Sequence, residues 1–193
     1  MSKEISKPLL WEEIENGKKI FDFAKGLAEK LEKICGKKHF EKKKIFILGA
    51  YVNDDESWEI SPKQELFKLK ISLQEIKDIC SFIMEDFGKL LEEDLINKFY
   101  ILAQLSDLIV NVIECDEKRF IIGIGHILEL GIILAKRELT EKTVVYVRKG
   151  AKLSLMLEKG AFKEHYIGSR VFFFESTEEL IQKVKHFVLN ELQ

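Results

Sequence analysis

Two patterns of apolar residues alternate along the chain. Short apolar runs bounded by glycine or polar residues predict strands buried on both faces, whereas stretches with an apolar residue every three or four positions predict amphipathic helices. The short runs lie at 45–48, 108–113, 143–147 and 171–174. Because these strands alternate with helices, we expect an α/β fold with four or five mostly parallel strands and helices on both faces of the sheet.

The helical pattern is longest near the N-terminus, from about residue 9 to residue 35. Ser6 and Pro8 suit the start of this helix and Gly36 suits its end, while Gly17 leaves open a break into two pieces. Further helices are expected at about 73–91, 94–105 and 153–158, from near residue 123, and after a cap at Ser176 or Thr177.

The polar stretch from Asn53 to Lys63 is expected to form a long loop at the carboxyl end of the first strand. Loops of this length inside a compact domain are often functional. The chain is therefore expected to comprise a helical extension over residues 1–40 and an α/β domain over residues 41–193.

Composition narrows the classes of partner. The chain has 193 residues, of which 46% are hydrophobic and 33% charged, and its formal net charge is −2. A chain with this charge balance has no strong positive electrostatic field with which to bind a nucleic-acid polymer. The apolar run 120–135 is shorter than the ~20 residues that a bilayer requires, and it contains His126 and Glu129, so we expect a core helix and no membrane partner.

The chain has three cysteines, Cys35, Cys80 and Cys115. They are odd in number and far apart, and none belongs to a C-x-x-C pair, so neither a disulfide framework nor a zinc site is expected. Acidic residues begin by Glu4, and no nearby apolar run suits a signal peptide. We therefore expect a reducing, cytoplasmic location.

The stretch 123–131 places one carboxylate, Glu129, in an otherwise apolar helix directly after a glycine-rich turn. A lone carboxylate in apolar surroundings is costly unless it is paired, hydrogen-bonded or protonated. Strand, loop, glycines and then helix is also where open α/β sheets bind ligands. We expect Glu129, Asp107 and the turn 49–51 to converge at the carboxyl ends of the strands.

Structural roles remain open for the same residues. Glu129 could cap a backbone amide or pair with Arg148 or Arg170. His126 lies three positions before Glu129, so it could be a core histidine bonded to that glutamate or a catalytic acid. No third ligand is evident from the spacing, so metal binding is not expected. Asp107 could satisfy amides where a helix meets a strand.

Several sequence segments together carry a resemblance. They are ILGAY (47–51), LSDLIV (105–110), GIGHILELGIILA (123–135), TVVYV (143–147) and FFFESTEEL (172–180). In this order they resemble the nucleoside 2-deoxyribosyltransferase-like superfamily, a Rossmann-like group related to TIR and other nucleotide-handling domains, over roughly residues 44–190. The resemblance implies a Rossmann/flavodoxin-like three-layer sandwich, to which this chain adds an N-terminal helix.

The resemblance also implies a chemistry. In that family the glutamate of E-L-G-x-A is the nucleophile, which corresponds to Glu129. His126 is a second catalytic candidate because it can share a helix face with Glu129. Attack on the anomeric carbon of a nucleoside or nucleotide releases the base and forms a covalent glycosyl-enzyme. The residues expected to bind substrate are Gly49, Ala50, Tyr51, Asp107, Asp116, Gly123 and Gly125. No cofactor is implied, and the expected assembly is a homodimer because such sites are commonly completed across subunits.

Two alternative functions remain open. The family's acid before the glycine of E-L-G is replaced by Gly123, with Asp116 the nearest acid upstream, and this favours a nucleotide-sensing module without catalysis. Gly49 and Gly125 could be needed only for backbone geometry or close packing. The third hypothesis is an assembly protein that acts through its N-terminal helix.

Overall fold

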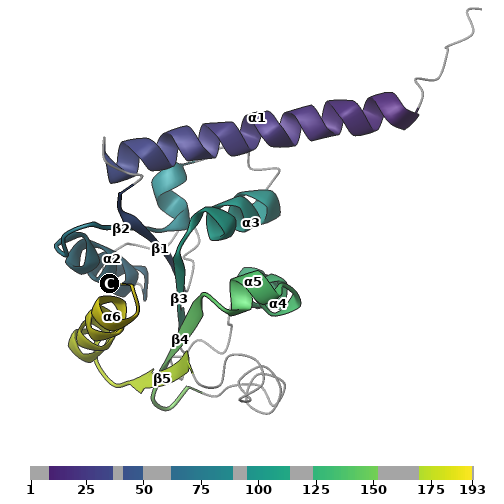
Figure 1. Cartoon of the computed structure of the whole chain (residues 1–193). Helices are drawn as coiled ribbons and strands as arrows, with labels where there is room; N and C mark the ends of the chain where they lie inside the picture. The colour runs from purple at the N-terminus through teal and green to yellow at the C-terminus, as the bar shows by residue number, and fades with distance from the viewer. Residues whose placement is uncertain are drawn as a thin grey trace, which may run out of the picture.

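The computed structural model describes residues 9–36, 41–49, 62–88, 95–113, 124–151 and 170–192, with the side chains of all but 9–16, 62–63 and 124–127 among them. In these residues five parallel strands form one sheet in the order β2-β1-β3-β4-β5. The strands are β1 (Lys43–Leu48), β2 (Ile79–Phe82), β3 (Leu108–Ile113), β4 (Thr143–Arg148) and β5 (Val171–Phe174) (Figure 1). This order is that of a doubly wound, flavodoxin-like sheet.

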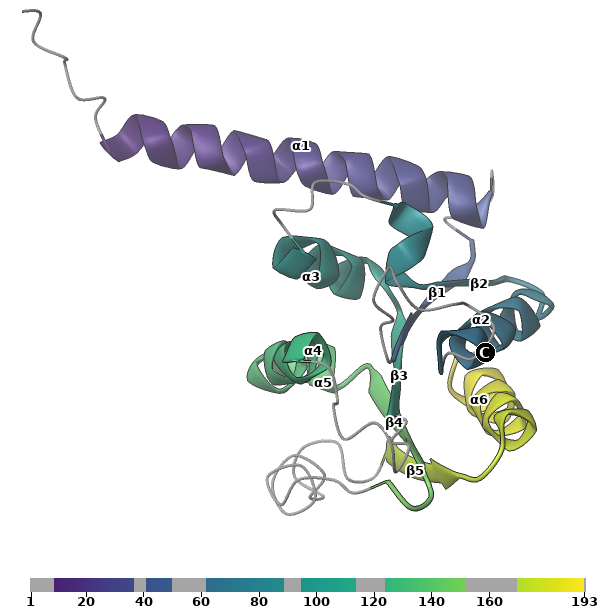
Figure 2. The same ribbon diagram turned by 180° about the vertical axis from the view of Figure 1, so that it is seen from behind.

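Helices cover both faces of the sheet. They are α1 (Leu9–Cys35), α2 (Pro62–Gln74), the 3-10 helix η2 (Met84–Phe87), α3 (Leu95–Leu105), α4 (Ile124–Ala135), α5 (Arg137–Thr140) and α6 (Thr177–Glu191). Figure 2 shows α2 and α6 on one face and α3, α4 and α5 on the other, with α1 lying across the outside of α3. The expected three-layer α/β fold is confirmed.

Alternation along each strand divides the core into two clusters. Ile109 and Ile113 of β3 pack on the face covered by α3 and α4, here called the α3/α4 face. Leu108, Val110 and Val112 pack on the opposite face, the α2/α6 face. All six residues of β3 are buried, as expected for the central strand of a parallel sheet with helices on both sides.

One predicted helix is wrong. The chain over 73–88, the described part of the predicted helix 73–91, does not continue as a helix, because α2 ends at Gln74 and β2 begins at Ile79. Asp78 has a positive φ of 62°, and this turn separates the two elements. The buried run ICSF is too short for periodicity to distinguish a strand from a helix, which explains the error. The predicted loop 53–63 also ends early, because Pro62 begins α2, a first-turn position that suits proline.

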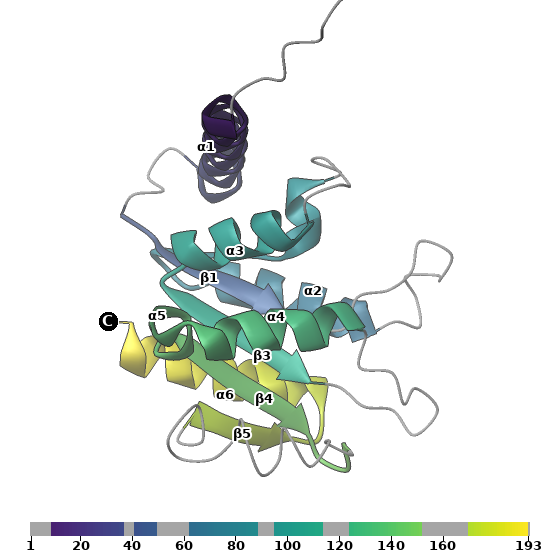
Figure 3. The same cartoon turned by 90° about the vertical axis from the view of Figure 1, so that its right-hand side faces the viewer.

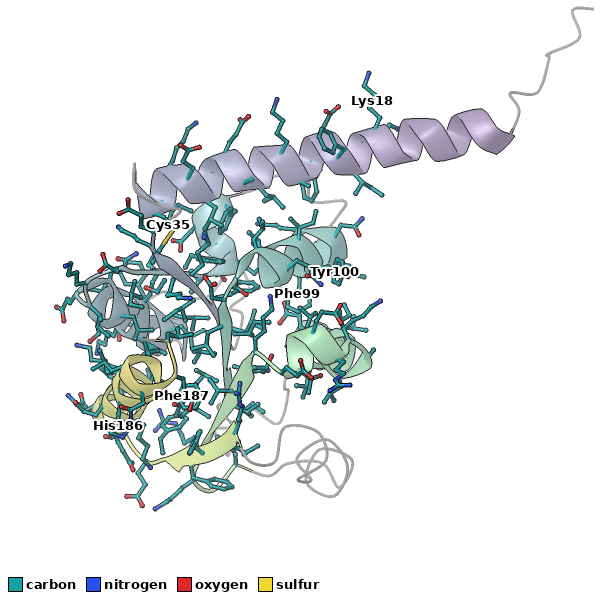
Figure 4. The ribbon with its side chains drawn as sticks, viewed as in Figure 1. Lys18, Cys35, Phe99, Tyr100, His186 and Phe187 are labelled. Atoms are coloured by element: carbon teal, nitrogen blue, oxygen red, sulfur yellow. A yellow bond between two sulfur atoms is a disulfide. The ribbon has the colours of Figure 1, made fainter. Side chains whose placement is uncertain are left out.

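The predicted N-terminal helix is confirmed as α1, and Gly17 does not divide it. Leu27 and Leu31 belong to the core on the α3/α4 face, so the second half of α1 packs on the domain. Gly36 ends the helix with a φ of +81° and donates its amide to the Glu32 carbonyl at 2.8 Å. The first half of α1 extends past α3, and Lys18 points away from the domain (Figure 4).

The cysteine prediction is wrong for one pair. Cys35, the last residue of α1, forms a disulfide with Cys80 of β2, with their Cα atoms 5.3 Å apart (Figure 4). The two are 45 positions apart in sequence and meet because α1 packs against β2, the strand at one edge of the sheet. Cys115 lies outside the described residues. Among the helices of the described ranges, none combines the length and the apolar content needed to cross a membrane.

Candidate functional site

The chain leaves β1 and β3 toward opposite faces of the sheet. After β1 it continues to α2, whose Leu66 and Leu69 pack on the α2/α6 face. After β3 it continues to α4, whose Ile133 packs on the α3/α4 face. β1 and β3 are neighbours in the sheet, so their carboxyl ends form a topological switch point. In open α/β sheets ligands bind at this point.

Asn111 of β3 lies directly below the switch point. It is aligned with Leu48, the last residue of β1, and with Val145 of β4. Both neighbours belong to the cluster on the α3/α4 face, so the Asn111 side chain lies on that face as well. The residue is fully buried.

Neither polar atom of the Asn111 amide has a hydrogen-bond partner in the part of the chain that the structure describes. A buried donor or acceptor left without a partner costs about 1–3 kcal/mol. Sequence reasoning missed this residue, because the run LIVNVI was interpreted only as a buried strand. The available signal was an asparagine among β-branched residues in a strand with two buried faces.

Glu129 lies on the side of α4 that faces the sheet. Glu129 is only 8% exposed, and it lies one helical turn before Ile133, a residue of the core. Leu128, the preceding residue, is 52% exposed and marks the outer side of the helix. The carboxylate is therefore carried by the buried face of α4, as the sequence predicted, and not by its solvated face.

Asn111 and Glu129 belong to elements that pack on the same face of the sheet, the α3/α4 face. Asn111 is two residues before the end of β3, a rise of about 7 Å. Glu129 is five residues after the start of α4, a rise of about 7.5 Å. Figure 3 shows α4 running alongside β3 and β4, with α5 at its far end. An amide and a carboxylate thus lie in the layer between the sheet and the helices of the α3/α4 face.

The structure describes some of the other predicted site residues and does not describe the rest. Gly49 directly follows β1 and is buried at the switch point. Gly125 and His126 lie in α4, which places His126 and Glu129 in one continuous helix. The side chain of His126 lies outside the described part of the structure, and so do four whole residues of the predicted site. These four are Ala50, Tyr51, Asp116 and Gly123.

Close packing accounts for Gly49. A Cβ at this position would lie 2.5 Å from Cδ1 and 2.8 Å from Cδ2 of Leu66, far inside van der Waals contact. Leu66 belongs to α2 and is buried in the core, so it has little room to move. The glycine therefore lets α2 approach the end of β1, and its packing role is supported independently of any ligand.

The expected convergence is wrong for Asp107. This residue immediately precedes β3, and its Oδ2 accepts a hydrogen bond from the Lys44 amide at 2.8 Å. The Asp107 amide in turn donates to the Lys44 carbonyl at 2.8 Å. In a parallel sheet the starts of β1 and β3 share the amino edge, opposite Gly49. Asp107 thus satisfies backbone groups at a junction of helix and strand, the alternative that the sequence left open.

The two arginines considered as partners of Glu129 form ion pairs with other glutamates. Arg148 Nη2 lies 2.6 Å from Oε2 of Glu65 in α2, and its guanidinium stacks over Phe174 on the α2/α6 face. Arg170 Nη2 lies 3.6 Å from Oε2 of Glu191. Neither ion pair involves Glu129. Arg148 instead joins α2 to the carboxyl end of β4.

Metal ligands do not gather in the described ranges, where no group of three or more His, Cys, Asp or Glu side chains could hold an ion. No protein-family model matches the chain, and no curated protein matches it. The chemistry of the site must therefore be argued from its own residues. A buried carboxylate can act as a nucleophile or stabilise positive charge, and a buried amide can both donate and accept a hydrogen bond.

Proposed function

We propose that the chain binds a nucleoside or nucleotide at the β1/β3 switch point and cleaves or transfers its N-glycosidic bond, with Glu129 as the nucleophile. The observation that carries the proposal is the burial of Glu129 on the sheet-facing side of α4. The resemblance of the segment 123–135 to the nucleoside 2-deoxyribosyltransferase-like superfamily supports the same role.

The proposed reaction has two steps. A Glu129 oxygen attacks the anomeric carbon while the bond from that carbon to the base nitrogen breaks, and the bonding electrons leave with the base. The leaving base takes a proton from a general acid, a role that we assign to His126, one turn earlier in α4. Water or a second acceptor then gives a proton to His126 and attacks the same carbon, the bond from that carbon to the Glu129 oxygen breaks, and Glu129 is released as a carboxylate.

The alternative function is a sensor that binds the same ligand without cleaving it. Gly123 and His126 stand where the family carries an acid and a hydroxyl residue, and these changes favour the alternative. Both functions use the same site, so they predict the same ligand-dependent stabilisation. They differ only in whether base is released.

The partner that we propose is a second copy of the chain. Phe21 is 69% exposed and Ile20 is 49% exposed, and both lie on α1 beyond its buried segment. Residues 12–15 include three glutamates, whereas Lys18 and Lys19 follow directly in the sequence. Antiparallel pairing of two α1 helices would bring these opposite charges together and cover the apolar residues.

The test of the catalytic proposal is base release. Purified protein is incubated with a panel of nucleosides, nucleotides and NAD, and released base is measured by chromatography for the wild type, Glu129→Gln and Glu138→Gln. Glu138 is an exposed carboxylate of α5 and provides the matched control. We expect release by the wild type and by Glu138→Gln, and at least a thousandfold loss in Glu129→Gln with ligand binding retained.

Each other outcome excludes one part of the proposal. Release at the wild-type rate by Glu129→Gln would show that another residue is the nucleophile. Thermal stabilisation by a ligand without any release of base would support the sensor. Neither release nor stabilisation with any member of the panel would exclude both functions and favour a role in assembly.

A further inference from the structure

We propose that Asn111 binds a planar edge of the ligand that carries a hydrogen-bond donor next to an acceptor. Nucleobases and carboxamides have such an edge. The amide of Asn111 would donate through Nδ2 and accept through Oδ1. This inference rests on the proposed ligand site but not on the proposed bond cleavage. The site so far defined by Glu129 thereby gains a second residue, which selects the ligand.

The first argument is the contrast with other buried polar side chains. Ser81 donates to the Lys70 carbonyl at 2.7 Å, and Thr143 donates to the Leu139 carbonyl at 2.6 Å. Ser106 likewise donates to the Ala103 carbonyl at 2.8 Å. The chain thus satisfies these buried hydroxyls internally, whereas both ends of the Asn111 amide lack a partner in the described structure. A ligand edge that carries an acceptor next to a donor would satisfy both ends of this amide.

The second argument is position. Asn111 is level with Leu48, the residue before Gly49, so it lies one residue below the point where the chain leaves β1. A valine or isoleucine would continue the apolar pattern of β3 and pack between Leu48 and Val145 without an unpaired group. An asparagine at this level places a recognition group at the edge where doubly wound sheets bind ligands.

The third argument is charge. Asn111 is neutral, and Glu129 faces the same layer with a carboxylate. A neutral amide offers a phosphate no opposite charge, whereas a neutral base can present a complementary donor and acceptor edge to it. Asparagine pairs in this bidentate way with the N6/N7 edge of adenine in DNA recognition. We therefore assign the base or carboxamide end of the ligand to this layer, and not its phosphate.

The experiment compares ligand binding by the full chain and by Asn111→Leu, which keeps similar bulk but removes both hydrogen-bonding groups. Thr143→Val is the matched control, because it also removes a buried polar group from the sheet, at the amino edge. Titration calorimetry and thermal shift are measured with adenosine, inosine, uridine, NAD and ribose 5-phosphate. Asn111→Asp, which keeps the shape and removes the donor, supplies a second variant if Asn111→Leu does not fold.

We expect the wild type to bind at least one probe that carries a base or carboxamide, and to bind ribose 5-phosphate at least tenfold more weakly. Asn111→Leu and Asn111→Asp should each weaken binding of the preferred probe at least tenfold, whereas Thr143→Val should not. Without ligand, Asn111→Leu should melt no lower than the wild type, because it removes an unsatisfied buried amide. Preference for a nucleoside would identify its base as the recognised edge.

Two results would overturn the inference, and they have different meanings. Wild-type affinity in both Asn111 variants would show that Asn111 does not contact the ligand, while the proposed function would stand. Binding of no probe by the folded wild type, or equal binding of ribose 5-phosphate, would remove the proposed nucleoside site itself.

Discussion

Gly49 and Leu66 are packed so closely that a Cβ at position 49 requires the Leu66 side chain to move. A Cβ there would lie 2.5 Å from Leu66 Cδ1. We predict that Gly49→Ala lowers the free energy of unfolding by about 1–3 kcal/mol, the usual cost of overpacking a buried site. Urea unfolding of the purified variant measures this loss.

A double-mutant cycle separates this contact from other effects. Leu66→Ala alone should cost about 2–5 kcal/mol, because it leaves a cavity in the core. In Gly49→Ala/Leu66→Ala the added methyl has room, so the two losses should not add. Full additivity would contradict the packing explanation and would return Gly49 to the list of ligand-binding candidates.

The Cys35–Cys80 disulfide should stabilise the oxidised protein substantially. The bond joins residues 45 positions apart, and loop-closure entropy for such a loop corresponds to about 4 kcal/mol. We predict that dithiothreitol lowers the free energy of unfolding of the wild type by a large part of this amount, and leaves that of Cys35→Ser/Cys80→Ser unchanged. Peptide mapping without reduction should recover the linked pair, and its absence after oxidation would contradict the structure.

The sequence predicted the elements whose signals are local. Strands β1, β3, β4 and β5 and helices α1, α3, α4 and α6 follow from periodicity, and Ser176 caps α6 by accepting from the Glu179 amide at 3.2 Å, as predicted. It missed β2, because four buried residues carry no distinguishing period. It also missed the Cys35–Cys80 pairing, since only the packing of α1 against β2 brings these residues together.

The candidate site was predictable only in part. The apolar surroundings of Glu129 in the sequence were enough to predict its burial. Asp107 was placed at the wrong edge, although its position before the strand already implied the amino edge of a parallel sheet. The asparagine in the run LIVNVI was a visible signal in the sequence, whereas its level beside Leu48 and its missing hydrogen-bond partners follow only from the strand register and the packing.

The pH dependence of the free energy of unfolding should reveal the lowered pKa of Lys98. This buried lysine donates to the Gly88 carbonyl at 2.9 Å, and burial lowers its pKa while Glu85 opposes the shift. The folded state therefore releases this proton at a lower pH than the unfolded state does. Between the lowered folded pKa and the ordinary value of 10.5, the unfolded state binds more protons, so this group makes stability rise with pH.

Comparison with Lys98→Met isolates this contribution, because the remaining lysines are common to both proteins. We predict that the free energy of unfolding of the wild type rises relative to that of Lys98→Met as the pH increases from about 8 toward 10.5. Guanidinium unfolding at a series of pH values measures the difference. A constant difference across this range would show that the Lys98 ammonium is not destabilised by burial.

The last prediction concerns the homodimer that we propose to form through α1. Phe21→Glu places a charge on the most exposed aromatic position described on α1, and it should raise the dissociation constant of the dimer at least tenfold by opposing burial of that surface. Phe67→Glu, at a 40% exposed position of α2, is the matched control and should leave the dimer intact. Light scattering at micromolar concentration measures both, and added salt should weaken the wild-type dimer because the pairing brings glutamates against lysines. A monomeric wild type at that concentration would exclude the proposed homodimer, and a dimeric Phe21→Glu would place the interface on another surface.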